Sequence, residues 1–315
     1  MLSVIPVYNG ERYLEETLQS LADQTTPPDR VIVIDDCSTD GTVALAESFK
    51  SLPVKVVRNE QNLGLFPNLN RALEYADEAE YFHLLLADDR VRPRFIESVV
   101  QTLKTTSAYA MAYSKYDWID AESQLLRRGG SQRTGAPVAV PHHAFIKRQC
   151  QLKSVSVGSV IIRSAYSALP VHFRQDMPHV ADCVFYAELA AQCTAVWELG
   201  EALCEIRRHD ENATKRNSRS LNAWVSDEFK AMRRISQLLP RRGWRTTLHD
   251  HFLQCLFAAR SRVKQQWTRK DDPQYADEIR AVVVRETRWY HRLAGSCVVI
   301  LRDLVMGRNR PERPR

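Results

Sequence analysis

The feature that most constrains the fold is a pattern repeated over the first hundred residues, in which an apolar strand, a polar loop and an amphipathic helix follow one another. Alternation of this kind predicts an α/β fold with a mostly parallel sheet and helices on both faces. The expected strands are residues 2–7, 31–34, 54–57 and 81–86, and the expected helices are residues 13–24, 42–49, 67–76 and 94–103.

Polar residues follow three of these strands: Tyr8-Asn9, Asp35-Asp36 and Asp88-Asp89. Open α/β sheets bind their ligands at the carboxyl ends of the strands, so these residues are expected to form one site. Two adjacent carboxylates are costly to bury unless a cation or hydrogen-bond donors lie beside them. The pair Asp88-Asp89 therefore predicts an Mg²⁺ or Mn²⁺ site that is completed by phosphate oxygens. The alternative is a polar turn before the helix that follows.

Five segments, in order and at matching spacing, resemble glycosyltransferase family 2. They are Ser3–Asn9 (Ser-Val-Ile-Pro-Val-Tyr-Asn), Ser20–Thr25, Val33–Thr42 (with Asp-Asp-x-Ser-Thr-Asp-Gly-Thr), Asn59–Gly64 (Asn-x-x-Asn-Leu-Gly) and Ala87–Asp89. The resemblance implies a GT-A (Rossmann-like) fold, a nucleotide-diphosphate-sugar donor of the UDP or dTDP type, a divalent cation and inversion at the anomeric carbon. The implied acceptor is a sugar or a lipid-linked hydroxyl, as in the synthesis of a cell-surface polysaccharide or glycolipid.

A nucleoside pocket is expected around the first two strand ends. By resemblance, Asp36 pairs with the base, Pro6 and Tyr8 line the same pocket, and Asp35 orients the loop or the ribose. A carboxylate suits the imide N–H of a uracil-like base, and an aromatic ring suits its face. Arg58, at the end of the third strand, is expected to reach the nucleotide. The alternative for Asp35-Asp36 is a turn that caps the next helix.

The diphosphate is expected to lie at the end of the fourth strand. The resemblance places Asp89 on the metal and Asp88 on the ribose or a water, and Arg90 is expected to bind a phosphate or to shield the acids. The segment 206–213 (Ile-Arg-Arg-His-Asp-Glu-Asn-Ala) resembles an Arg-x-His-x-x-Asn motif of the family. Its Arg207, Arg208 and His209 are expected to close over the diphosphate or to complete the metal shell. The alternative is a solvated turn.

Inverting transfer needs a base that takes the proton of the acceptor hydroxyl. The candidate is Asp182, which precedes an expected helix, as the base of the family does. The same position is favourable for a capping carboxylate, which is the structural alternative. Asp176, six residues upstream, is the alternative base.

Charge is uneven along the chain. Residues 1–229 carry 24 Lys and Arg against 30 Asp and Glu, whereas residues 230–315 carry 20 against 8, and together they give the net charge of +6. The prediction is a catalytic domain over residues 1–215 and a basic helical extension over residues 216–315. Its expected helices are residues 221–239, 246–266, 275–292 and 295–305. Interleaved Arg and aromatic residues suit an anionic membrane surface. A plain packed subdomain is the alternative, and no recognised module supports nucleic-acid binding.

The remaining sequence features narrow the protein class. Seven cysteines show no Cys-x-x-Cys spacing, which argues against a zinc ribbon or disulfide scaffold and for a reducing compartment. No leader is expected before the first strand, so the predicted location is cytoplasmic, with peripheral attachment at the inner face of the membrane. A non-catalytic binding member of the same fold is the remaining rival. A phosphoacceptor receiver and a dinucleotide-binding dehydrogenase are disfavoured, because Tyr8-Asn9 rather than acids or a Gly-x-Gly-x-x-Gly follow the first strand.

Overall fold

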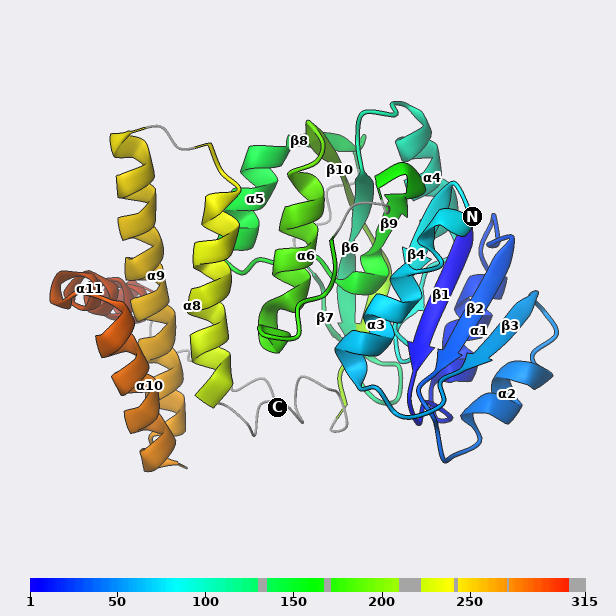
Figure 1. The fold of residues 1–315 in the computed structure, drawn as a ribbon, viewed down its shortest axis with the longest axis horizontal. Helices are drawn as coiled ribbons and strands as arrows, with labels where there is room; N and C mark the ends of the chain where they lie inside the picture. Colours follow the sequence, from blue (N-terminus) through cyan, green and yellow to red (C-terminus); the bar gives the residue numbers. More distant parts are fainter. Residues whose placement is uncertain (130–134, 167–170, 210–221, 241–242, 271, 306–315) are drawn as a thin grey trace.

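A central mixed sheet carries helices on both faces and continues into a layer of C-terminal helices in this computed structural model (Figure 1). The structure describes residues 1–129, 135–166, 171–209, 222–240, 243–270 and 272–305. The strands of the sheet lie in the order β3-β2-β1-β4-β9-β6-β10-β5, with β7 beside β6 and β8 beside β10. The predicted α/β class, with helices on both faces and a helical extension, is confirmed.

The N-terminal part of the sheet is parallel and follows the predicted alternation. Its strands are β1 (Leu2–Val7), β2 (Arg30–Asp35), β3 (Val54–Arg58) and β4 (Tyr81–Leu84). Its helices are α1 (Leu14–Ala22), α2 (Thr42–Ser48), α3 (Leu65–Leu73) and α4 (Phe95–Lys104), with a short 3₁₀ turn at Ala76–Glu78. Parallel register places Val7 beside Asp35, and Asp35 beside Arg58, so the polar ends of these strands share one edge.

The second part of the sheet is mixed. Strand β9 (Val160–Arg163) runs antiparallel to both of its neighbours, β4 and β6 (Met111–Ile119), and β10 (Ala195–Arg207) runs parallel to β6. The shorter strands are β5 (Arg90–Val91), β7 (Leu125–Arg127) and β8 (Val138–Pro141). The helices here are α5 (His142–Cys150) and α6 (Ala181–Ala190), with 3₁₀ turns at Val157–Ser159, Ser164–Tyr166 and Pro178–Val180.

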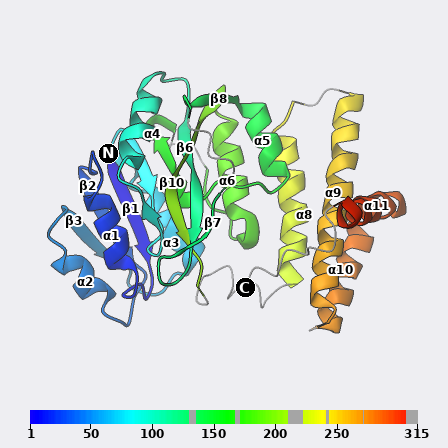
Figure 2. The same ribbon diagram turned by 180° about the vertical axis from the view of Figure 1, so that it is seen from behind.

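Two apolar cores fill the space between the sheet and its helices. One lies under α1 and α4 and includes Leu14, Leu18, Phe95 and Val99. The other lies under α3, α5 and α6 and continues into the C-terminal helices through Phe229 and Phe257. Figure 2 shows α1 and α4 together on the face opposite to α3, α5 and α6. Burial of apolar surface on both faces holds the strand ends in fixed positions.

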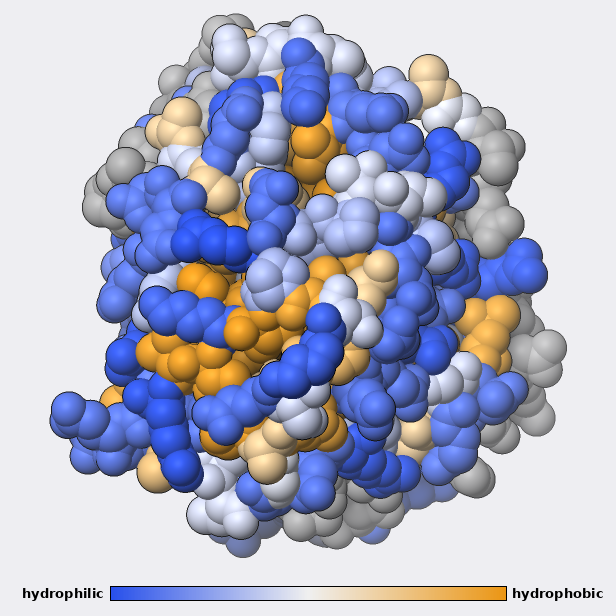
Figure 3. Space-filling view, turned by 90° about the vertical axis from the view of Figure 1, so that its right-hand side faces the viewer, coloured by the Kyte–Doolittle hydropathy of each residue, from blue (hydrophilic) through white to orange (hydrophobic). Residues whose placement is uncertain are grey.

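The sheet ends at the edge strand β3. Figure 3 shows this end of the molecule, where apolar residues gather in one patch among hydrophilic ones. Partly buried residues of α2 and β3 pack against the core here: Leu45, Phe49, Val54 and Val56. Lys55 and Arg58 alternate with the valines of β3 and are exposed. Charged side chains on an edge strand oppose pairing with another sheet edge.

The helices described in the C-terminal region are α8 (Asn222–Gln237), α9 (Trp244–Thr268), α10 (Pro273–Glu286) and α11 (Trp289–Val305). The helix predicted over residues 275–292 is wrong, because the chain is extended at Thr287 (φ −130°, ψ 151°) and a new helix begins two residues later. The predicted boundary between residues 215 and 216 lies outside the described residues. Helix α8 packs on α5 and α6, which joins this region to the sheet. Among the described helices, none is both long enough and apolar enough to cross a membrane.

Candidate functional site

The loops that follow β1 and β2 are tied together at the carboxyl edge of the sheet. The Asn9 backbone N–H donates to Ser38 Oγ (2.8 Å), and the Thr39 backbone N–H donates to Asn9 Oδ1 (2.9 Å). Gly10 N donates to Thr42 Oγ1 at 2.8 Å. The loop after β1 is therefore fixed by the Ser-Thr-x-Gly-Thr segment after β2, which explains why both motifs occur together in the sequence.

Asp35 and Arg58 form an ion pair at the same carboxyl edge of the sheet. Asp35 is fully buried and its carboxylate accepts the Ser38 backbone N–H. Arg58 Nε lies 3.2 Å from Asp35 Oδ2, and its guanidinium also donates to the Ser38 carbonyl oxygen at 2.8 Å. The Arg58 side chain remains about half exposed (54%), so its outer face is accessible to a ligand. Asp35 thus orients the loop, one of its two expected roles.

Asp36 organises the next loop. Its Oδ1 accepts Asn59 Nδ2 (2.7 Å) and the Leu63 backbone N–H (2.8 Å), and its Oδ2 accepts the Gly64 N–H (2.8 Å). Gly64 has a φ of +87°, a conformation that favours glycine, and α3 begins at the next residue. The Asn-x-x-Asn-Leu-Gly motif is therefore the partner of Asp36. Each carboxylate oxygen has two lone-pair sites, so Oδ2 keeps capacity for a ligand.

Pro6 and Tyr8 lie at the carboxyl end of β1. Pro6 is buried in β1 beside Ile34, where its missing N–H and fixed φ make the strand end rigid. Tyr8 follows the last residue of β1 and is 45% exposed, although it is a large aromatic side chain next to a buried strand. An exposed ring at a strand end is available to stack on a planar ligand.

Asp89 is a buried acid of the site whose pKa is strongly raised. It is 1% exposed, its Oδ1 accepts the Arg207 backbone N–H (2.9 Å), and its Oδ2 has no hydrogen-bond partner among the described residues. Burial, and then the charge of Asp88, raise the pKa of Asp89 well above its usual value. Among the described residues, Arg207 offsets only part of the effect of burial on Asp89.

Arg207 lies beneath Asp88 and Asp89, a position that the sequence did not predict. It is 1% exposed and donates to the Asp88 carbonyl oxygen (2.8 Å), to Glu16 Oε2 (2.8 Å) and to Ser123 Oγ (2.8 Å). The expectation that Arg207 closes over a diphosphate is wrong, because these contacts bury its guanidinium on the α1 face. The alternation of side chains along a strand could have predicted this position, since the consecutive residues Arg207 and Arg208 must point to opposite faces.

His209 reaches the acids from the end of β10. Its Nε2 lies 3.0 Å from Asp88 Oδ2, its ring packs 4.8 Å from the Tyr13 ring, and its side chain is 10% exposed. Among the described residues, no three His, Cys, Asp or Glu side chains are grouped to hold a metal ion by themselves. The donor set still fits a cation that takes part of its shell from phosphates, because Mg²⁺ is often held by one or two carboxylates plus substrate oxygens. The orphaned Oδ2 of Asp89 points to the same conclusion.

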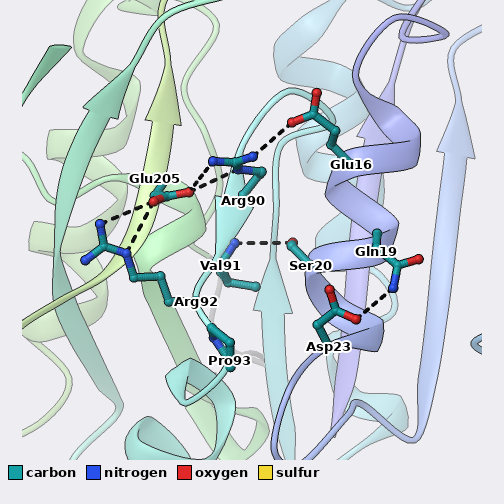
Figure 4. A pocket seen from close by; sticks show the side chains of 9 residues that line it. All are labelled: Glu16, Gln19, Ser20, Asp23, Arg90, Val91, Arg92, Pro93 and Glu205. Atoms are coloured by element: carbon teal, nitrogen blue, oxygen red, sulfur yellow. Dashed lines mark hydrogen bonds and ion pairs between the residues drawn. The ribbon is translucent and has the colours of Figure 1, made fainter. Parts of the chain in front are cut away.

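Arg90 does not take either of its expected roles, although it follows Asp89 directly. Its guanidinium pairs with Glu205 (2.7 Å) and Glu16 (3.1 Å), in a cavity of about 380 Å³ between α1, β5 and β10. Figure 4 shows Arg90 and Arg92 converging on Glu205 inside this cavity. Because strand β5 alternates, Arg90 projects to the α1 side of the sheet, and its pairing with two acids there replaces a phosphate contact.

Asp182 lies in the first turn of α6, as predicted, and its Oδ1 accepts the Cys183 N–H (2.8 Å). Burial raises the pKa of Asp182, and hydrogen bonds from Ser154 and Cys183 offset only part of that effect. Its charge also raises the pKa of Tyr116 and Tyr186, after the larger effect of burial on both. A partly buried carboxylate with a raised pKa is a stronger base than an ordinary one, which suits it to accept a proton.

Asp176 lies in a different environment. It is exposed and forms two hydrogen bonds with Arg174, Nε to Oδ1 (2.9 Å) and NH2 to Oδ2 (3.2 Å). The hydrogen bond with Arg174 is the main cause that lowers the pKa of Asp176. A paired, exposed carboxylate of lowered pKa is a weak base, so the geometry favours Asp182 over Asp176.

Arg208 lies on the opposite face of β10 from Arg207 and His209. Its guanidinium carbon is 3.8 Å from the centre of the Trp118 ring, and its backbone N–H donates to the Ile119 carbonyl oxygen (2.8 Å). Partial burial, and then the charge of Arg127, lower the pKa of Arg208. Its predicted contact with the diphosphate stays a prediction. The last part of its motif, residues 210–213, lies outside the described residues.

Residues 3–153 match the family model of glycosyl transferase family 2. An uncharacterized glycosyltransferase of Haemophilus influenzae is 29% identical over 212 residues, which are 65% of this chain and 64% of that protein. The putative teichuronic acid biosynthesis glycosyltransferase TuaG of Bacillus subtilis is 34% identical over 37% of this chain and 46% of its own length. The poly(ribitol-phosphate) beta-N-acetylglucosaminyltransferase TarS of Staphylococcus aureus is 37% identical over 34% of this chain and 18% of its own. The chain thus spans less than two thirds of each of these relatives.

Solved structures share the fold. S. aureus TarS 1–349 in complex with UDP-GlcNAc superimposes with a TM-score of 0.60 at 17% identity, over 90% of each chain. The mannosyltransferase PcManGT of Pyrobaculum calidifontis, in complex with GDP-Man and Mn²⁺, gives a TM-score of 0.56 at 15% identity, over 95% of this chain and 86% of that one. At these identities the likeness concerns the fold, and it confirms the predicted GT-A class. The N-terminal half of the chain is thus related to family 2 glycosyltransferases.

Proposed function

We propose that this protein is an inverting glycosyltransferase, which moves a sugar from a nucleotide-diphosphate donor to an acceptor hydroxyl in the synthesis of a cell-surface polysaccharide or glycolipid. The observation that carries this proposal is a pair of carboxylates with raised pKa values, the buried Asp89 after β4 and the partly buried Asp182 at the start of α6. They come from separate segments, and no described residue lowers the pKa of either to its ordinary value. Two such groups suit a reaction that needs a cation on the leaving group and a base on the acceptor.

In this proposal the nucleoside binds between the loops after β1, β2 and β3. Tyr8 offers an exposed ring for stacking, and Pro6 keeps the strand end beneath it rigid. Asp36 offers the remaining lone pairs of Oδ2 to an imide N–H, and Arg58 offers its exposed side. The pairing of a carboxylate with an imide favours a uridine or thymidine nucleotide over a guanosine one. The presence of UDP-GlcNAc and UDP in TarS structures supports the same donor class.

Asp89 would hold a divalent cation together with His209, and Asp88 would contact the ribose or a metal-bound water. When bound, such a cation would stabilise negative charge on the departing diphosphate as a Lewis acid. The residues beneath it have a separate role. Arg207 ties the Asp88 carbonyl and the Asp89 carboxylate to β10, so the acids are held in place before any ligand arrives.

Asp182 would take the proton from the acceptor hydroxyl. As the acceptor oxygen forms its bond to the anomeric carbon, the bond from that carbon to the diphosphate oxygen breaks on the opposite face, which inverts the configuration. The electron pair of the broken bond leaves with the nucleoside diphosphate, and the proton ends on the Asp182 carboxylate. Partial burial of Asp182 limits the access of water to its carboxylate.

A non-catalytic binding member of the fold is the second candidate, and it would keep the nucleotide pocket without turnover. A screen of UDP-, dTDP-, GDP- and CMP-sugars with Mn²⁺, read by thermal shift and by release of the nucleotide, separates the two. Nucleotide binding with slow release of UDP or dTDP in water supports the enzyme. Binding without any release, over a range of acceptors, would favour the binding member.

Calorimetry of nucleoside diphosphate binding tests the site. Asp89→Ala should weaken binding in the presence of Mn²⁺ at least tenfold, about 1.4 kcal/mol, since one charged oxygen ligand is lost. Asp36→Ala should weaken binding with or without metal, and Asp23→Ala, an exposed acid on the far side of α1, is the matched control. Equal affinity of the wild type with and without EDTA would remove the metal from the proposal.

We further propose that the C-terminal helices rest on an anionic membrane surface at the cytoplasmic face. Exposed apolar residues recur at helical spacing on α9 (Trp244, Leu248, Phe252) and on α11 (Trp289, Leu293, Ile300). Arg288 and Arg292 flank the second group, and residues 230–315 carry a net charge of +12. Apolar insertion together with basic charge is the combination that binds anionic bilayers.

A further inference from the structure

Four side chains on one face of the sheet form a basic aromatic platform beside the predicted base. Arg127 of β7 is the register partner of Trp118 of β6, so both side chains project to the same face. The Arg208 guanidinium lies over the Trp118 ring at 3.8 Å, and the Tyr116 ring packs edge-on against Trp118 at 5.4 Å. The platform is thus Tyr116, Trp118, Arg127 and Arg208.

The platform faces the reaction centre rather than the far side of the sheet. Cys204 is the register partner of Tyr116, and parallel partners share a face. A Cβ built on Gly158 would lie 3.5 Å from Cys204 Sγ and 3.8 Å from Asp89 Oδ2, so Cys204 and Asp89 border the same glycine. Asp182, Arg127 and Arg208 all act electrostatically on the Tyr116 hydroxyl, which places the predicted base and both arginines around one side chain.

The two arginines have no acid partner among the described residues. Neither Arg127 nor Arg208 forms an ion pair or a side-chain hydrogen bond with any part of the chain that the structure describes, although they are close enough to repel one another. Arginines elsewhere around the site, such as Arg58, Arg90 and Arg207, each contact at least one carboxylate. Two neighbouring guanidinium groups without an acid leave a site for a ligand anion, and phosphate matches their fork geometry.

We propose that Arg127 and Arg208 bind a phosphate group carried by the acceptor, so that the acceptor is a phosphorylated sugar or polyol whose hydroxyl is thereby directed to Asp182. This inference rests on the proposed transfer reaction and names its acceptor class. It also assigns Arg208 to the acceptor instead of the donor diphosphate. Stacking on Trp118 restricts the Arg208 side chain before binding, which lowers the entropy cost of holding the phosphate.

The test is a titration of the full-length protein, loaded with UDP and the diamagnetic Mg²⁺, with glycerol 3-phosphate, inorganic phosphate and uncharged glycerol, followed by NMR. Saturable binding of the two phosphates, and none of glycerol, is expected. The double variant Arg127→Ala/Arg208→Ala should weaken glycerol 3-phosphate binding at least tenfold and change UDP affinity less than twofold. Arg280→Ala, an exposed arginine on α10, is the charge-matched control. Arg208→Lys should show an intermediate loss, since lysine keeps the charge but not the stacked fork.

Two outcomes would overturn the proposal. If UDP affinity falls tenfold in the double variant while glycerol 3-phosphate binding persists, the pair belongs to the donor diphosphate. If the wild type does not bind the phosphates saturably, or the double variant binds them equally well, the platform holds no acceptor anion. Failure of the proposed transferase function has a different signature, since the protein would then bind no nucleotide, or bind it without release in the donor screen, whatever the phosphate titration gives.

Discussion

Buried acids behave differently in the two regions of the molecule. In the C-terminal helices, Glu228 is 1% exposed, and Lys264 (2.9 Å) and Arg260 (3.0 Å) both reach it. Burial alone would raise the pKa of Glu228, but these two cations lower it overall. In the sheet region, burial raises the pKa values of Asp89 and Asp182, and no cation among the described residues reverses the effect. Where the chain only needs stability it pairs its charges, and where a ligand or proton must enter it leaves them uncompensated.

The largest effect predicted from this comparison is on folding. Glu228→Ala leaves Lys264 and Arg260 without their shared acid, and the loss of one partner of a buried pair costs about 3 to 5 kcal/mol. Urea unfolding should show a fall of this order, with UDP affinity of the folded protein within twofold of wild type. The exposed pair Arg285–Glu286 is the control, and Glu286→Ala should change stability by about 0.5 kcal/mol or less. An unchanged urea midpoint for Glu228→Ala would mean that this buried charge cluster does not stabilise the C-terminal helices.

For Asp182 we expect the opposite pattern, a large loss of transfer rate without a loss of stability. Asp182→Asn should lower the transfer rate about 10²-fold or more, because general-base catalysis contributes that much, with donor affinity within about threefold. Stability at neutral pH should not fall. The raised pKa of folded Asp182 means that its favourable contribution is present at low pH and is lost as pH rises through that pKa, so the neutral Asn should gain on wild type as pH rises.

Asp176→Asn is the matched control for the base. Its exposed carboxylate is paired with Arg174, so its loss should leave the transfer rate within twofold. A normal rate for Asp182→Asn together with an inactive Asp176→Asn would reverse the assignment. If both variants transfer sugar at the wild-type rate, neither residue is the base.

The parts of the fold that could be predicted from the sequence are those that a local residue pattern determines. The parallel strands and their helices follow from local apolar period, and the polar strand ends follow from the geometry of a parallel sheet, so Asp36 and Asp89 could be assigned to one edge. Strand β9 between β4 and β6 could not be placed, because its partners are distant in sequence and a four-residue apolar run contains no information on direction. The break at Thr287 was missed, since neither Gly nor Pro marks it.

Side-chain direction was the harder part of the site. Arg90, Arg207 and Arg208 all lie next to predicted site residues, yet Arg90 and Arg207 point to the α1 face and pair with Glu16. The sequence shows adjacency along the chain, whereas the face of the sheet decides which residues meet. Arg127 had no motif of its own, and only its register opposite Trp118 connects it with Arg208.

A buried histidine, His83, makes the stability of the sheet region depend on pH. His83 is fully buried in β4, where its Nε2–H donates to the Gly158 carbonyl oxygen (2.9 Å), and burial lowers its pKa to about 4. A depressed folded pKa gives stability that is present above the unfolded pKa of about 6.5 and lost as pH falls toward 4. Unfolding free energy should therefore fall by about 2 kcal/mol from this group between pH 7 and pH 5. His83→Gln should lose this part of the slope, and NMR should show a neutral imidazole at pH 5; a charged one there would contradict the prediction.

The smallest predicted effect on stability concerns the exposed apolar residues of α11. Leu293 is 58% exposed, so Leu293→Glu should change unfolding free energy by about 0.5 kcal/mol or less. If this face rests on an anionic bilayer, the same change removes apolar insertion and adds a repelled charge, so co-sedimentation with acidic vesicles should fall about tenfold and wild-type binding should weaken as salt rises. Val138→Glu places the same charge on an equally exposed residue of the sheet region (57%) and should leave vesicle binding unchanged. Equal losses in both variants would mean that net charge alone governs binding, and binding to neutral vesicles as strong as to acidic ones would remove the electrostatic part of the proposal.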